Sequence, residues 1–278
     1  MPRSSYDPSP GASSAGHAAL SPLGALLRRR DPDRFFTALF APPARREALF
    51  ALYAFDTELA RAGAVTREPT IALIRLAWWR EVVEGAARAH EVATPLAAAL
   101  SAGLLDRADL LAVIAAREID AEGAIPTLAD WRAWLEGGAG GIAVAAGRLL
   151  GAPAPEALRP LGAAWGAARV LRAIPALARQ GRSLLPQDMQ TAHGLTADVL
   201  AQTRPAPAVL AVHRVLTGEG RRWLAAAGRV RLPRAAIAAA LPAVLARRDL
   251  GRAAMVPAEA RGLGDRLAVL LAAARARV

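Results

Sequence analysis

The carboxylates whose spacing best suits metal chemistry in this sequence are Glu118 and Glu122. They are four residues apart, which puts both on one face of a helix, while Asp120 lies between them on another face. Such a pair can hold one cation, and Asp120 can instead serve the fold by pairing with an arginine. Charged side chains are more often paired with one another than bound to metal, and we therefore predict no metal site.

Other reactive side chains are scarce. The chain has no cysteine and no lysine, which excludes disulfides, thiolate nucleophiles, Cys-ligated metals and catalytic or P-loop lysines. The four histidines, at positions 17, 90, 193 and 213, are isolated from one another. The glycine-rich stretch at 137–141 is not followed by the Lys-Ser/Thr of a phosphate loop, so we expect it to serve close helix packing or a kink.

The charge of the chain is strongly basic. It has 35 arginines against 24 acidic residues, for a net charge of +11. Such an excess suggests a polyanionic partner, such as a nucleic acid or an anionic membrane surface. The arginines form short, scattered clusters without a zinc-finger, RNA-binding or basic-zipper pattern. We therefore expect most of them to lie on solvated helix faces, and we expect no nucleic-acid partner.

Helices are expected to position these side chains. The chain is 54% hydrophobic and is dominated by Ala, Leu and Arg, which have the highest helix propensities. We predict an all-α protein with a disordered leader at residues 1–29 and one helical domain at 30–278. No apolar run reaches the ~18–20 residues of a transmembrane helix. The expected location is the cytoplasm or, peripherally, the inner face of a membrane.

Local signals place several helix boundaries. Pro42–Pro43 and Pro69 suit the first turn of a helix, where a missing backbone N–H costs nothing. Thr127 and Asp130 have the spacing of an N-terminal capping pair. A long helix at 155–180 is expected to be interrupted at Pro175.

Four segments resemble the squalene/phytoene synthase family. They are, in chain order, DRFFTALFAPPARREALFALYAF at 33–55, EPTIALIRLAWWREVV at 68–83, AREIDAE at 116–122 and LGAAWGAARVLRAIPALARQGRSLLPQDM at 161–189. The resemblance implies an isoprenoid-synthase fold, in which helices surround a central cavity. Active members join two prenyl diphosphates head to head, and two Asp-rich motifs on facing helices hold Mg²⁺ ions that neutralise the leaving diphosphate.

The chain departs from the family pattern at both motifs. The positions where the resemblance implies aspartates hold Ala60, Ala64, Ala173 and Leu177. Asp56 and Glu58 lie near the first motif, but residues two apart point about 200° apart around a helix and cannot form the same ligand face. Between residues 137 and 187 the only acidic residue is Glu156. We therefore expect no catalytic residue and no cofactor.

The substitution pattern itself resembles a catalytically degenerate branch of the family, which includes a mitochondrial assembly factor for respiratory complex I. The segment LRAIP, at 171–175, takes the place of the second Asp motif. The resemblance implies a pseudoenzyme that acts as a non-catalytic binding or assembly factor. The alternative is an active head-to-head prenyl-diphosphate transferase of isoprenoid biosynthesis, for which Mg²⁺ would be required.

The same resemblance implies a set of binding residues. One guanidinium can donate two parallel hydrogen bonds to phosphate oxygens. The basic positions expected to flank an anionic ligand are Arg75, Arg80, Arg179 and Arg182. The expected cavity-lining residues are Tyr53 and Trp79. The competing interpretation pairs Arg80 with Glu84 at i,i+4 and places the aromatic residues in the core. Expected partners are a lipid or prenyl chain, an anionic membrane surface, or an assembly intermediate of a respiratory complex.

Overall fold

The computed structural model describes residues 20–63, 68–252 and 261–278. Within these ranges the chain is helical, without a β-strand, and two isolated bridges join Ile125 to Pro186 and Arg231 to Arg277. The all-α prediction is confirmed. The helices, with the two 3₁₀ turns written η, are α1 (Pro22–Arg30), α2 (Pro32–Ala38), α3 (Pro43–Ala62), α4 (Pro69–Glu84), α5 (Ala93–Ser101), α6 (Arg107–Ala121), α7 (Leu128–Gly137), α8 (Ala139–Leu149), η1 (Pro155–Leu158), α9 (Arg159–Arg179), α10 (Gln187–Ala192), α11 (Ala197–Ala201), α12 (Pro207–Ala227), η2 (Ile237–Ala239), α13 (Pro242–Gly251) and α14 (Leu263–Arg275).

Several helix starts agree with the local signals in the sequence. Pro43 and Pro69 open α3 and α4. Thr127 caps α7 by accepting a hydrogen bond from the Asp130 backbone, and the Asp130 carboxylate accepts one from the Thr127 backbone in return. This reciprocal arrangement satisfies donors that a helix N-terminus otherwise leaves unpaired.

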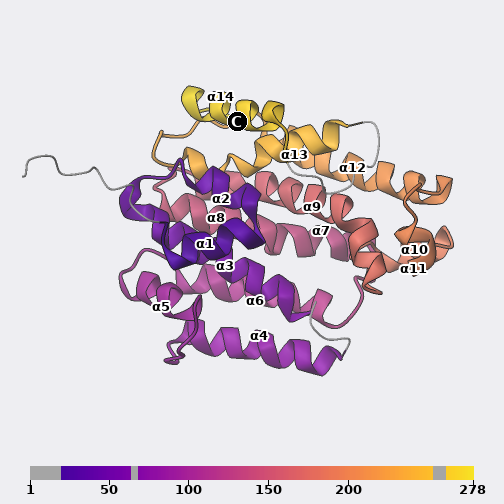
Figure 1. Ribbon diagram of the computed structural model, residues 1–278, viewed down its shortest axis with the longest axis horizontal. Coiled ribbons are helices and arrows are strands. Elements are labelled where there is room, and N and C mark those ends of the chain that lie inside the picture. The colour runs from indigo at the N-terminus through magenta and orange to yellow at the C-terminus, as the bar shows by residue number, and fades with distance from the viewer. Residues whose placement is uncertain (1–19, 64–67, 253–260) are drawn as a thin grey trace, which may run out of the picture.

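Helix α9 forms the centre of the molecule, and α7, α8, α12 and α13 pack against it (Figure 1). Close approach of α8 requires glycine: a Cβ on Gly162 would lie 2.3 Å from the Ala139 carbonyl oxygen, and one on Gly140 would lie 2.9 Å from the Arg159 carbonyl oxygen. The expected packing role of the glycine-rich stretch is thus confirmed.

The expected interruption at Pro175 is wrong, because α9 continues through this residue to Arg179. A proline in a helix interior removes one backbone hydrogen bond and costs about 3 kcal/mol or more. Ile174 and Ala178, on either side of it, are buried. Packing on both sides therefore holds the last turn in helical geometry.

Folded structure also begins earlier than the predicted boundary at residue 30. Helix α1 starts at Pro22, is capped by the Ser21 hydroxyl, and buries Leu23, Leu26 and Leu27 against α3. The part of the predicted leader at residues 1–19 lies outside the described residues. Among the helices that the structure describes, none combines the length and apolarity needed to cross a bilayer.

Candidate functional site

A pocket of about 270 Å³ lies between α3, α6, α7, α9 and the turn that follows α9. Ala60 lines it from α3, and Ala173 and Leu177 line it from α9. These are three of the four positions where the family resemblance implies aspartates. The fourth, Ala64, lies outside the described residues. The two helices therefore face one another across a cavity, as the resemblance implied.

Asp56 is the one carboxylate among the residues that line this pocket in the described part of the chain. It is buried, and each of its oxygens accepts a hydrogen bond from an arginine: Oδ2 from Arg34 Nη1 at 2.7 Å and Oδ1 from Arg117 Nη2 at 2.7 Å. Burial alone would raise the pKa of Asp56, but Arg117 and Arg34 outweigh it and hold the pKa well below its usual range. Asp56 is therefore a charged partner of two arginines at neutral pH.

Arg34 connects Asp56 to a second buried carboxylate. Asp31 caps α2 by accepting a hydrogen bond from the Arg34 backbone N–H at 3.0 Å, and it also accepts one from Arg34 Nε at 2.6 Å. Arg169, on α9, approaches Asp31 at 3.1 Å. Burial opposes ionisation of Asp31, yet Arg34 and Arg169 lower its pKa. The floor of the pocket is thus a network of alternating charges that ties α2, α3, α6 and α9 together.

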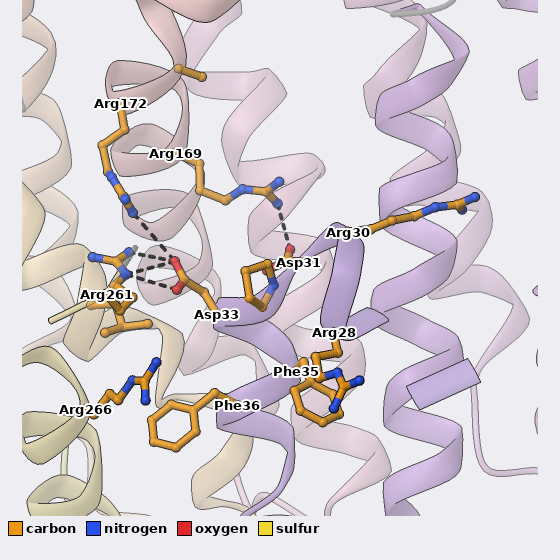
Figure 2. Close-up of a pocket in the computed structure, with 13 residues that line it drawn as sticks. Arg28, Arg30, Asp31, Asp33, Phe35, Phe36, Arg169, Arg172, Arg261 and Arg266 are labelled. Atoms are coloured by element: carbon orange, nitrogen blue, oxygen red, sulfur yellow. Dashed lines mark hydrogen bonds and ion pairs between the residues drawn. The ribbon is translucent and has the colours of Figure 1, made fainter. Parts of the chain in front are cut away.

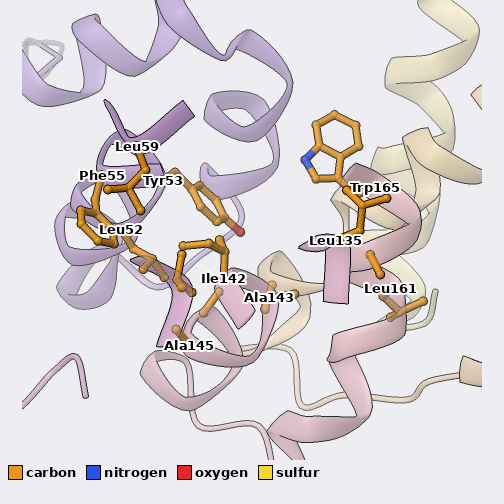
Figure 3. Close-up of a cluster of buried hydrophobic side chains, with 14 of the residues drawn as sticks. Leu52, Tyr53, Phe55, Leu59, Leu135, Ile142, Ala143, Ala145, Leu161 and Trp165 are labelled. Atoms are coloured by element: carbon orange, nitrogen blue, oxygen red, sulfur yellow. The ribbon is translucent and has the colours of Figure 1, made fainter. Parts of the chain in front are cut away.

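The two predicted cavity-lining aromatic residues lie elsewhere. Tyr53 belongs to the buried cluster in Figure 3. The Arg34 guanidinium lies 5.0 Å from the centroid of its ring, and burial raises the pKa of its hydroxyl. It borders a small void of about 20 Å³ next to the pocket. Trp79 is a core residue that packs edge-on against Phe55, with ring centroids 5.5 Å apart. The aromatic residues in the pocket wall are instead two tryptophans, Trp134 and Trp165.

The four predicted anion-binding arginines do not form one site. Arg182 lines the pocket, whereas Arg75 and Arg179 are exposed and lie outside its lining. Arg80 forms an ion pair with Glu118 on α6 and not the expected pair within its own helix with Glu84. The four arginines belong to different elements: two lie on α4, one ends α9 and one lies in the turn after it. Helical spacing within one segment does not show which of these side chains points into the pocket.

Three further arginines that line the pocket were not predicted from the sequence, namely Arg61, Arg117 and Arg169. Arg61 pairs with Glu58 at 3.1 Å and remains nearly half exposed at the pocket wall. Arg182 comes from the turn after α9, and its guanidinium lies next to the C-terminal end of α3. A Cβ on Gly63 would be 3.3 Å from Nη2 of Arg182. Burial lowers the pKa of Arg182, and the nearby Asp120 only partly opposes this effect. The pocket thus offers positive charge beside apolar walls.

The carboxylates Glu118, Asp120 and Glu122, which are close in sequence, do not gather around a common metal position in the described part of the chain. Glu118 is engaged by Arg80, and Asp120 accepts a hydrogen bond from Trp134 Nε1 at 3.0 Å. Burial raises the pKa of Asp120, although Arg117 opposes this effect. Across the residues with described positions, no three or more His, Cys, Asp or Glu side chains gather in an arrangement that could hold a metal ion.

A second pocket, of about 630 Å³, adjoins the first, and Arg169 and Ala173 line both. Figure 2 shows three of its arginines directed at two aspartates: Asp33 forms ion pairs with Arg261 at 2.7 Å and Arg172 at 3.6 Å, and Asp31 pairs with Arg169. The charges of these three arginines are therefore paired within the protein.

Comparisons with known proteins agree with this geometry. A sequence profile of the family described as Squalene/phytoene synthase matches residues 27–270. The chain is 27% identical to NADH dehydrogenase (ubiquinone) complex I, assembly factor 6, of Homo sapiens over 68% of this chain and 58% of that protein. It is 29% identical to the same factor of Bos taurus, over 68% of this chain and 62% of that protein. The chain thus spans about three fifths of the length of these relatives.

Solved structures of low sequence identity share the fold. A dehydrosqualene synthase in complex with a ligand superposes with a TM-score of 0.72 at 13% identity, over 91% of this chain and 94% of that one. A squalene synthase from Alicyclobacillus acidocaldarius gives a TM-score of 0.60 at 17% identity, over 82% and 90%. The all-α architecture is therefore that of the isoprenoid synthases. Since the family profile covers most of the sequence, the chain belongs to the squalene/phytoene synthase family.

Proposed function

We propose that this protein is a non-catalytic member of its family that acts by binding, as a factor in the assembly of respiratory complex I. One observation carries the proposal: the facing positions on α3 and α9 present Ala60, Ala173 and Leu177 to the pocket, where family resemblance implies metal-binding aspartates. The similarity to complex I assembly factors supports the assembly role.

The donor set of the pocket does not fit Mg²⁺. This ion requires oxygen ligands in near-octahedral geometry, commonly one or two carboxylates together with the substrate phosphates. Asp56 is the only carboxylate in the described lining, and both of its oxygens accept hydrogen bonds from arginines. A cation there would have to displace Arg34 or Arg117 from a buried ion pair. The proposed function accordingly uses no metal cofactor.

The pocket suits an amphiphile with an anionic head. Its apolar wall includes Leu135, Val170 and Leu184, while Arg182 and Arg61 supply positive charge. Small-molecule sites are usually lined by apolar side chains, with a small number of polar groups that orient the ligand. We therefore include a lipid or prenyl chain as the ligand class, bound as it stands and released unchanged.

Deletion of the gene in the cell that makes the protein tests the assembly role. We expect its membranes to lose NADH:quinone oxidoreductase activity while succinate oxidation persists, and we expect the wild-type gene to restore the first activity. Undiminished complex I in the deletion strain would overturn the proposal.

Pocket-filling variants test whether the cavity takes part. Ala173→Phe projects a large ring into the pocket wall, whereas Ala176→Phe adds the same ring three residues away on α9, outside the described lining. We expect the first to fail in complementation and the second to succeed, with both proteins melting at similar temperatures. Equal complementation by both would remove the cavity from the mechanism.

A further inference from the structure

The outer face of α14 carries a stripe of exposed leucines. Leu263, Leu267, Leu270 and Leu271 expose 79%, 56%, 45% and 52% of their surface. At about 100° per residue these four side chains fall within one arc of about 100° around the helix. Elsewhere in the described chain, exposed large hydrophobic residues occur singly, apart from the pair Ile71 and Ile74. The stripe is thus the largest gathering of its kind on one described helix.

The opposite face of α14 is fixed to the protein. Asp265 and Val269 are buried, and Asp265 forms ion pairs with Arg248 and Arg252 from α13 and the residue after it. Helix α14 lies at one edge of the molecule, beside α13 (Figure 1). Since its inward face is already occupied, the leucine stripe points away from the core.

A groove of about 750 Å³ runs along the same helix and is lined by four arginines, Arg229, Arg247, Arg275 and Arg277, together with Leu271. None of the four forms an ion pair or a side-chain hydrogen bond with another described residue. This groove differs in that respect from the pocket of Figure 2, where Arg261 and Arg172 form ion pairs with Asp33 and also with Asp249. The charge beside α14 is therefore available to an external anion.

We propose that α14 is the surface by which the protein docks on an anionic lipid bilayer. The leucine stripe enters the boundary between headgroups and acyl chains, and the arginine groove binds lipid phosphates. An apolar helix face flanked by cations is the arrangement that binds in the plane of a membrane interface. Arg266 on one flank and Arg275 on the other complete this pattern, since each lies beside the stripe on the helical wheel.

The charges favour a membrane over other occupants. A second copy of the chain, docked symmetrically through this face, would bring two sets of unpaired arginines together, which like-charge repulsion opposes. A nucleic acid would satisfy the arginines but would leave the leucines exposed to water. A bilayer with anionic lipids satisfies both features at once.

Sedimentation of the full chain with vesicles tests the docking. We expect binding to phosphatidylcholine vesicles that contain about one third phosphatidylglycerol to be at least tenfold tighter than binding to pure phosphatidylcholine. Both Leu263→Ser/Leu267→Ser/Leu271→Ser and Arg247→Glu/Arg275→Glu should weaken it by about tenfold or more. The matched controls are Ile71→Ser/Ile74→Ser on α4 and Arg45→Glu/Arg214→Glu on α3 and α12, which should bind like the wild type. Unchanged binding by the α14 variants, or equal loss in the controls, would overturn the proposal.

The absence of cysteine from the sequence permits a direct readout of insertion. A Leu267→Cys variant labelled with an environment-sensitive fluorophore should brighten and shift to the blue on anionic vesicles, whereas the same label at Ile74→Cys should not respond. A response at position 267 that grows with protein concentration, without vesicles, would show that a second copy covers the stripe and would contradict membrane docking. The α14 surface shares no lining residue with the pocket between α3 and α9, so these results stand apart from the assembly role.

Discussion

Asp56 illustrates how a carboxylate in a cavity wall can belong to the fold and not to chemistry. Its two oxygens accept hydrogen bonds from Arg34 on α2 and Arg117 on α6, so one side chain on α3 joins three helices. A buried ion pair contributes little net stability compared with apolar packing, but removing one partner leaves an uncompensated buried charge. The two ion pairs of Asp56 therefore fix how α2, α3 and α6 are arranged beside the pocket.

Replacing this carboxylate should destabilise the fold strongly. We expect Asp56→Asn to lower the free energy of unfolding by about 3–5 kcal/mol, because Arg117 loses its carboxylate partner and the buried Arg34 keeps only Asp31. The matched change Asp188→Asn, at an exposed position of α10, should alter it by less than about 0.5 kcal/mol. Urea unfolding followed by circular dichroism measures both, and similar midpoints for the two variants would show that the network is not needed.

Lowering the pH should remove the stability that the buried ion pairs of Asp56 and Asp31 confer. The folded-state pKa values of Asp56 and Asp31 are lowered by their arginines from an ordinary value of 3.8, so the stability they confer is fully present well above that value. It is lost as the pH falls through the ordinary value toward the lowered ones. We expect the melting temperature to be nearly flat from about pH 7 to 5 and to fall below about pH 4. The fall should be shallower in Asp56→Asn, and an equally steep fall would contradict this assignment.

At the residue scale, the sequence predicted the positions that face the pocket but not the partners beneath it. Ala60 and Ala173 were located by their spacing from recognisable segments, and the structure places them on facing helices of one pocket. The partners of Asp56 lie 22 and 61 residues away along the chain, on other helices. Such pairing depends on how helices pack, which local spacing does not encode.

At the element scale, the approach of α8 to α9 depends on glycine. A Cβ on Gly162 would lie 2.3 Å from the backbone oxygen of Ala139, which cannot rotate away. We expect Gly162→Ala to destabilise the protein by about 1–3 kcal/mol through overpacking. Gly218→Ala, within α12 and with no atom near the added methyl, should stabilise it by about 0.5–1 kcal/mol. Opposite signs in thermal melts are the expected result, and a neutral Gly162→Ala would show that the two helices can separate without cost.

Helix ends were predictable where a side chain caps the backbone or a proline opens a turn, as at Thr127 and Pro69. Two misinterpretations came from the same residue type. Pro22 and its Ser/Gly neighbours suggested a leader although Leu23, Leu26 and Leu27 have helical spacing, and Pro175 suggested a break although its neighbours are buried. In both places tertiary packing outweighed the local preference.

At the scale of the whole molecule, the net charge of +11 divides into two kinds of arginine. Most of those that line the two central pockets meet carboxylates, as Arg117 and Arg261 do. The four that line the groove beside α14 meet no described acid, and this groove lies next to exposed leucines. The unpaired arginines of this groove thus face outward, while the facing positions of the pocket between α3 and α9 hold Ala60, Ala173 and Leu177.

Pyrophosphate release tests most directly whether the protein is non-catalytic. The purified protein is incubated with farnesyl or geranylgeranyl diphosphate, Mg²⁺ and NADPH, beside an active squalene synthase as the positive control. We expect no release above the rate without protein, because no described carboxylate in the pocket is free to hold the metal. Metal-dependent release at about 1 s⁻¹ or faster, the range of ordinary enzymes, would contradict it.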